Sequence, residues 1–222
     1  DQIISSKWML TMTGNKLIED HSIVIDGNTI KDILPTKDIN SAYQWVSRID
    51  LKEQLILPGL INNQVSSSIL TMNGNSHLEK NYMMEYSKTN VKYMIAEMLK
   101  NGITTFSDVG LSPDISIEQV RQTNIRANIG LPIFKHKSFW ADEEKEYLYK
   151  SLAIYDEYKS DPNIRLFFHL DSINKLSKNI ILKISEIANE LDIPVRMSLN
   201  TSQKEIDKCK SKYKLRPLQF LE

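Results

Sequence analysis

The chain has a single cysteine, no long apolar run and no excess of charge of either sign. One cysteine, Cys209, among 222 residues cannot form an internal disulfide, so we expect an intracellular, cytoplasmic setting. No apolar run approaches the ~20 residues that a membrane-spanning helix needs, and no signal peptide is visible. Lys and Arg together number 28, as do Asp and Glu, so the formal net charge is zero. That balance gives no electrostatic basis for binding nucleic acid or an anionic membrane.

The first 57 residues have the pattern of short β-strands. Apolar runs recur at 8–12, 46–49 and 55–57. Between them, Ser22–Ile25 and Thr29–Leu34 flank Asp26-Gly27, and this dipeptide favours a hairpin with a type I′ turn. We therefore expect a small all-β unit over residues 1–57.

After Pro58 the pattern changes to strands that alternate with helices. Helical periodicity is clearest at 177–191, where Ser177 is a suitable N-cap. Short apolar strands separated by helices are typical of a parallel sheet covered by helices. The expected strands are 60–65, 103–109, 125–133, 164–170 and 195–199, and the expected helices are 83–101, 116–123, 142–158, 177–191 and 202–212.

One segment at this change of pattern resembles a known family. Leu57-Pro58-Gly59-Leu60-Ile61-Asn62 is similar to the amidohydrolase segment that leads from a small β-sandwich into the first strand of a (β/α)8 barrel. The similarity continues at 96–108, 125–130 and 177–195. Lys214-Leu215-Arg216-Pro217 resembles a segment of the branch that deaminates methylthioadenosine, S-adenosylhomocysteine and chlorinated triazines.

The resemblance implies an α/β fold in two parts. An N-terminal β-sandwich portion would cover residues 1–57, and part of a (β/α)8, TIM-type barrel would cover residues 58–222. A complete barrel typically takes about 250 residues, so the second part has room for about five strand–helix units. The chain then corresponds to a fragment of a longer protein, or another polypeptide covers the opening.

The resemblance also implies a zinc site, and the residues here depart from it. In the family, a His-x-His pair, a later His with a neighbouring Glu, and a last His and Asp hold Zn²⁺ and activate a water. The pair falls on Gln64 and Ser66, and the later His and Glu fall on Ser198 and Thr201. Amides and neutral hydroxyls are far weaker zinc ligands than imidazole. We therefore expect no metal or other cofactor, and impaired chemistry.

The remaining polar candidates are few. Of the four histidines, His21, His77 and His136 have no obvious role, whereas His169 ends a predicted strand near the expected site. Asp171 takes the place of another family histidine and is either a functional carboxylate or a solvated loop residue. Asp108 is expected to be structural. Ser66, Ser67 and Ser68 invite a serine nucleophile, but no base stands near them.

Three hypotheses follow. The leading one is a catalytically impaired amidohydrolase homologue, which acts as a binding or assembly subunit or is a decaying gene product. The second is a hydrolase of non-peptide C–N bonds, with a site rebuilt from His169 and Asp171. The third is a structural partner of an active paralogue. A homo-oligomer or such a paralogue would cover the open barrel, and neither nucleic acid nor a membrane is an expected partner.

Overall fold

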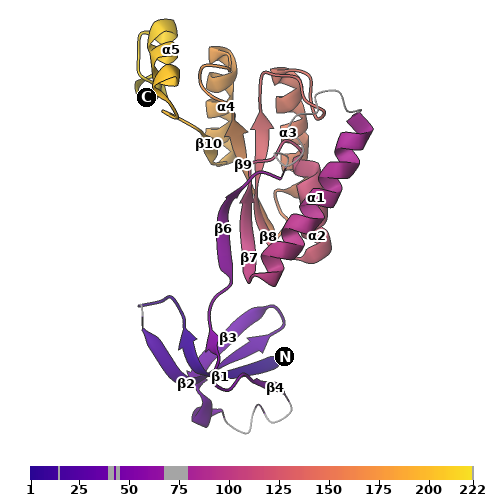
Figure 1. Ribbon diagram of the computed structural model, residues 1–222, viewed down its shortest axis with the longest axis vertical. Helices are drawn as coiled ribbons and strands as arrows, with labels where there is room; N and C mark the ends of the chain where they lie inside the picture. Colours follow the sequence, from indigo (N-terminus) through magenta and orange to yellow (C-terminus); the bar gives the residue numbers. More distant parts are fainter. Residues whose placement is uncertain (15, 40–42, 44–45, 68–79, 222) are drawn as a thin grey trace. The chain divides into compact units, whose positions relative to one another are not determined.

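The structure, a computed structural model, describes residues 1–221 apart from residue 15 and residues 40–42, 44–45 and 68–79. Its internal contacts divide the chain into two compact units, Asp1–Gly59 and Leu60–Glu222 (Figure 1). The division lies next to the change of sequence pattern at Pro58. Each unit is described by itself below.

The first unit is a five-stranded sheet built around its first strand. The bounds are β1 (Gln2–Leu10), β2 (Leu17–Asp26), β3 (Thr29–Pro35), β4 (Ser47–Asp50) and β5 (Leu55–Ile56), with a 3-10 turn, η1 (Thr36–Asp38). β1 pairs antiparallel with β2 and parallel with β4 and β5. Ile3, Met9 and Val24 are buried in this unit. The strand predicted at 8–12 begins earlier, at Gln2, because polar residues such as the buried Ser6 belong to the strand.

The predicted hairpin is present, but its turn differs from the prediction. Asp26 pairs with Thr29, so the loop residues are Gly27 and Asn28 rather than Asp26 and Gly27. A type I′ turn needs positive φ at both loop residues, whereas only Gly27, at +58°, has it. The turn therefore needs glycine only at its first position. The Thr29 hydroxyl closes the turn by donating to the Asp26 carbonyl oxygen, at 3.0 Å.

The second unit is a parallel five-stranded sheet with helices between its strands, which confirms the predicted fold class. The strand order is β10-β9-β8-β7-β6, a curled part of a TIM-type barrel (Figure 1). The strands are β6 (Leu60–Val65), β7 (Ile103–Asp108), β8 (Arg126–Ile133), β9 (Ile164–Leu170) and β10 (Val195–Met197). The helices are α1 (Lys80–Lys100), α2 (Pro113–Thr123), α3 (Glu144–Tyr158), α4 (Lys178–Leu191), α5 (Gln203–Tyr213) and α6 (Pro217–Leu221). None of the helices in the described ranges is long and apolar enough to cross a membrane.

The two faces of this sheet have different chemistry, because successive side chains of a strand point to opposite faces. One face packs against the helices and carries the core, with Leu131 and Phe168 among its fully buried residues. The opposite face, called the inner face here, carries the residues between them, including Gly130, Phe167 and His169. The ends of two helices confirm local predictions. The Ser177 side chain caps α4 by accepting from the Ile180 amide, and Gly102 ends α1 with φ +76°.

Gly130 marks the tightest approach on the inner face. A Cβ at this position would lie 2.9 Å from Cζ of Phe167, 3.0 Å from the Asp108 carbonyl oxygen and 3.0 Å from Cβ of His169. Two of those neighbours are backbone or near-backbone atoms that cannot swing away. Glycine here therefore lets β7, β8 and β9 lie close together beneath the Phe167 ring.

The replacement Gly130→Ala should destabilise the chain more than Gly102→Ala does. At Gly102 nothing lies within 4 Å, so alanine meets only the strain of a left-handed conformation, about 1–2 kcal/mol. At Gly130 the overpacking should cost about 2–3 kcal/mol. Urea unfolding of the two variants measures both values. Equal losses, or a smaller loss for Gly130→Ala, would contradict the close packing inferred at Gly130.

Candidate functional site

The carboxyl ends of parallel strands meet at one edge of a barrel sheet, and this edge is where barrel enzymes act. Gln64 lies in β6 and is exposed, and the half-buried Ser66 follows the strand directly. Ser198 follows β10 and is exposed. The structure therefore places these three residues, predicted at the family's zinc-ligand positions, at the carboxyl edge of the sheet.

A buried carboxylate holds the chain at the end of β6. Asp108, 1% exposed, accepts from the Ser67 amide over 3.1 Å and from the Ser67 hydroxyl over 2.7 Å. It also accepts from the Gly110 amide over 2.9 Å and from the Ser116 hydroxyl over 2.5 Å. Asp108 thereby ties the segment after β6 to β7 and α2. The structural role expected for Asp108 accounts for every one of these contacts, and Ser67 serves as a donor to this carboxylate.

Thr201, at the position of the family's proton-transfer Glu, takes part in the N-terminal turn of α5. Its amide donates to Oε2 of Glu205 over 2.8 Å, and its hydroxyl donates to the same oxygen. Burial alone would raise the pKa of Glu205, but the hydrogen bonds from Thr201 and from the Ser172 hydroxyl outweigh burial and lower that pKa. A carboxylate from one turn further along α5 therefore lies beside Thr201. The sequence prediction missed Glu205, although Ser202-x-x-Glu205 is a capping-box pattern.

His169 lies on β9 with its ring toward the inner face, between Pro132 and Arg196 of the neighbouring strands. Its ring meets Phe134 edge-on at 5.3 Å, and its buried Nδ1 has no hydrogen-bond partner among the described residues. Burial is the main cause that lowers the pKa of His169 from 6.5 to about 4; Arg196 lowers it further, while Asp171 acts in the opposite direction. The imidazole is therefore neutral at physiological pH.

Asp171, just after β9, has a side chain that is largely buried. Its side chain is 12% exposed. Oδ1 accepts from the Ser172 amide over 2.7 Å and from Nζ of Lys175 over 3.1 Å, and Oδ2 lies 3.6 Å from Nδ1 of His136. His136, for which the sequence indicated no role, thus belongs to the same polar cluster as Asp171.

Arg196 is the charged residue of β10 and reaches across the inner face. Its Nη1 donates to the Ser107 hydroxyl of β7 over 3.1 Å and lies 3.5 Å from the Asn63 carbonyl oxygen of β6. Its guanidinium lies 5.2 Å from the centre of the Phe167 ring. A side chain from one edge strand contacts the other edge strand, so the sheet is strongly curled and a fixed positive charge occupies its inner face.

Zinc does not fit the donors at this edge. The positions after β6 and β10 offer one amide and neutral hydroxyls, which are poor ligands for Zn²⁺. Within the described ranges, no three His, Cys, Asp or Glu side chains are grouped so that they could hold a metal ion. His21 lies in the first unit, where its Nδ1 is 2.6 Å from the Glu19 carbonyl oxygen, and His77 lies outside the described residues.

The chain is similar to several known proteins in sequence and in fold. No protein-family model matches the chain. The 5-methylthioadenosine/S-adenosylhomocysteine deaminase of Saccharophagus degradans is 26% identical over 238 aligned positions, covering 99% of this chain and 53% of that protein. A zinc-bound adenosine deaminase from Xanthomonas campestris superposes with a TM-score of 0.86 at 21% identity, covering 100% of this chain and 54% of its own. The zinc complex of atrazine chlorohydrolase TrzN from Arthrobacter aurescens gives 0.79 at 16% identity, covering 100% and 57%.

The likeness to these two structures shows that the chain shares the fold of about half of each of them. These similarities agree with the amidohydrolase resemblance carried by the segment at Leu57–Asn62. It spans about half the length of the curated relatives it matches.

The lowered pKa of His169 predicts a pH-dependent stability. Between pH 6.5 and about 4, the imidazole of His169 is protonated in the unfolded chain and neutral in the folded chain. The contribution of this group is therefore fully present above pH 6.5 and is lost as the pH falls through 4. Its size is about 2–3 kcal/mol. His169→Gln should flatten the fall in unfolding free energy between pH 7 and pH 4.5, as measured by urea unfolding.

A matched control is His21→Gln, which removes an imidazole from the first unit. This variant should keep the pH dependence of the unmodified chain. The burial account of His169 would fail if both variants lost stability with falling pH as steeply as the unmodified chain.

Proposed function

We propose that this chain is a metal-free member of the amidohydrolase superfamily, impaired in zinc-dependent hydrolysis and acting as a binding or assembly protein. The proposal rests on Gln64, Ser66 and Ser198 at the positions where the family resemblance expects imidazole ligands. Thr201 stands where it expects the proton-transfer carboxylate. Hydroxyls and an amide neither bind Zn²⁺ tightly nor move a proton near neutral pH.

The charges on the inner face support the same proposal. Arg196 lies beside His169 in the pairing of β9 with β10, and its guanidinium lowers the pKa of that imidazole. The same fixed charge repels a divalent cation that approaches the buried Nδ1. Carboxylates would offset this repulsion, but Asp171 is already paired with Lys175 and faces His136. A metal ion near Nδ1 of His169 would be repelled by Arg196. It would also have to compete with Lys175 and His136 for the carboxylate of Asp171.

Elemental analysis after incubation with zinc and desalting tests the proposal. The unmodified chain should retain less than about a tenth of a zinc ion per chain, because too few strong ligands remain. The variant Gln64→His/Ser66→His/Ser198→His restores three imidazoles at the family positions and should retain more zinc than the unmodified chain does. A Gln64→Asn/Ser66→Thr/Ser198→Thr variant is the matched control, with three replacements and no new ligand.

Near-stoichiometric zinc in the unmodified chain would contradict the proposal and favour the second candidate. That candidate is a C–N hydrolase acting on a purine-, pyrimidine- or triazine-like compound through His169 and Asp171. Its support is that His169 Nδ1 and Asp171 Oδ2 are both buried without hydrogen-bond partners in the described chain. A pKa of about 4 makes His169 a weak base at neutral pH, however, and an efficient general base needs a pKa near the working pH. Ammonia release from 5′-methylthioadenosine that His169→Gln abolishes would establish this candidate.

The assembly part of the proposal concerns the open sheet. Within the described chain, β6 and β10 each pair on one side only, and Ile61 on β6 is 71% exposed. Unpaired strand edges favour pairing with further polypeptide. The remainder of a longer chain, a second copy or a paralogue would supply it. Light scattering coupled to size-exclusion chromatography should give a mass above 25.7 kDa for the isolated chain, and a stable monomer at all concentrations would contradict self-association.

A further inference from the structure

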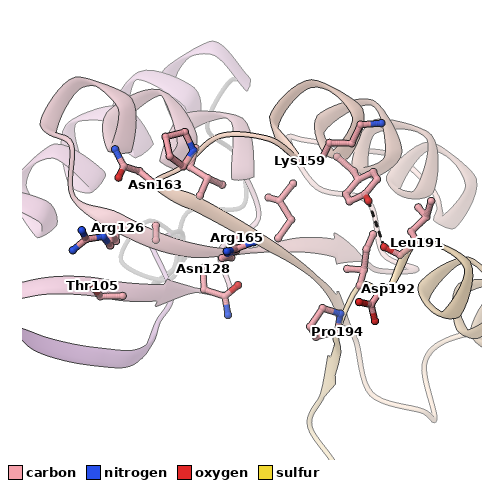
Figure 2. Close-up of a pocket in the computed structure, with 15 residues that line it drawn as sticks. Thr105, Arg126, Asn128, Lys159, Asn163, Arg165, Leu191, Asp192 and Pro194 are labelled. Carbon is pink, nitrogen blue, oxygen red and sulfur yellow. Dashed lines mark hydrogen bonds between the residues drawn. The ribbon is translucent and has the colours of Figure 1, made fainter. Parts of the chain in front are cut away.

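A second polar site lies at the opposite end of the sheet, at the amino ends of β8 and β9. A cavity of about 730 Å³ opens there between the segments that precede β9 and β10 (Figure 2). Cavities of about 300–1,000 Å³ are the size that small-molecule ligands occupy. None of the residues discussed at the carboxyl edge lines this cavity.

The cavity is positively charged. Arg126, Lys159 and Arg165 line it, and Asp192 is the one acidic residue among its lining side chains. Figure 2 shows Arg126 on one side of the cavity and Asp192 on the other, with Arg165 and Asn128 between them. The single carboxylate is thus placed away from Arg126, and the cationic side of the cavity is left uncompensated.

The strand pairing places the two arginines on one face of the sheet. Asn128 of β8 pairs directly with Arg165 of β9, and Arg126 precedes Asn128 by two residues, so all three side chains leave the same face of the sheet. Both arginines are exposed, and in the described chain neither guanidinium has an ion-pair or hydrogen-bond partner. Each guanidinium therefore offers N–H donors that an oxyanion in the cavity can take up.

Hydrogen bonds hold the wall of the cavity in place without using these donors. The Asn163 carbonyl oxygen accepts from the Ala127 amide over 2.9 Å, and the Tyr155 hydroxyl donates to the Leu191 carbonyl oxygen over 3.5 Å, the dashed line in Figure 2. Lys159 is held by Asp156 at 2.9 Å. The rim is therefore ordered before any ligand arrives, which lowers the entropy that binding loses.

We propose that this cavity binds a small organic oxyanion, a phosphate or carboxylate carried on a body with an apolar face. Arg126 and Arg165 bind the oxyanion. Pro162, Leu191 and Pro194 line the same cavity without being buried in the core, and their apolar side chains contact the body. The site is independent of the zinc-ligand positions and does not rest on the function proposed above.

Titration of the 222-residue chain with phenyl phosphate, benzoate and neutral benzyl alcohol tests this site by calorimetry and by ¹H–¹⁵N NMR. At least one of the two anions should bind with a Kd below about 1 mM, with amide shifts concentrated at 126–128, 163–166 and 191–194. Benzyl alcohol should bind far more weakly. Tighter binding of phenyl phosphate would identify phosphate as the preferred group, and tighter binding of benzoate would identify carboxylate.

The variant Arg126→Gln/Arg165→Gln should weaken anion binding by at least about tenfold, since two charge-assisted pairs are lost. Arg48→Gln/Arg216→Gln removes the same charge from exposed positions outside the cavity and should leave binding unchanged. If the first variant folds poorly, Arg165→Lys keeps the charge but loses the guanidinium fork and should weaken binding less. No anion binding up to about 10 mM, shifts elsewhere in the chain, or equal weakening in the control variant would overturn the proposal.

Discussion

The buried carboxylate of Asp108 is the interaction on which the second unit depends most. A carboxylate without hydrogen bonds is very unfavourable inside a protein, and four donors from Ser67, Gly110 and Ser116 stabilise this one. Those donors come from the segment after β6, the segment after β7 and α2. The interaction therefore decides where β6 ends. With β6 fixed, Gln64 and Ser66 take the places at the carboxyl edge that the family resemblance assigns to zinc ligands.

Around this framework, fixed side-chain charges stand where the resemblance implies a metal. Arg196 spans the inner face to Ser107 of β7, and His169 remains neutral beside it. Glu205 bonds to Thr201 and brings a carboxylate back to that neighbourhood from one turn along α5. Hydrogen bonds within the chain thus hold Arg196 and Glu205, while the buried Nδ1 of His169 has no partner in the described chain. The carboxyl edge is therefore organised by contacts within the chain, while Arg126 and Arg165, at the other end of the sheet, have no hydrogen-bond or ion-pair partner in the described chain.

Sequence reasoning predicted the alternation of strands and helices well, because buried parallel strands and amphipathic helices have distinct periods. It placed the start of α2 too late, at 116 rather than Pro113, although proline is common in the first turn of a helix. It missed the first half of β1, where Ser6 is buried and donates to the Gln54 carbonyl oxygen, a partner far along the chain. It also missed the short helix α6, which directly follows the segment at Lys214–Arg216.

The site residues also divide into those with a local sequence signal and those whose partners lie far along the chain. The resemblance singled out Gln64, Ser66, Ser198 and Thr201 because local motifs position them, and their assignment to lost ligand positions stays a prediction. His136 and Arg196 were not singled out, since their partners Asp171 and Ser107 come from other strands, and only folding makes those pairs. A charged residue between Val195 and Met197 was the one local signal for Arg196 on the inner face.

The central claim is that this face is organised by neutral His169 and fixed Arg196 rather than by a metal. NMR titration of the His169 ring nitrogens, with and without zinc, measures this most directly. The account predicts a midpoint near pH 4 and resonances that zinc does not move; a midpoint near 6.5, or a zinc-dependent shift at neutral pH, would contradict it.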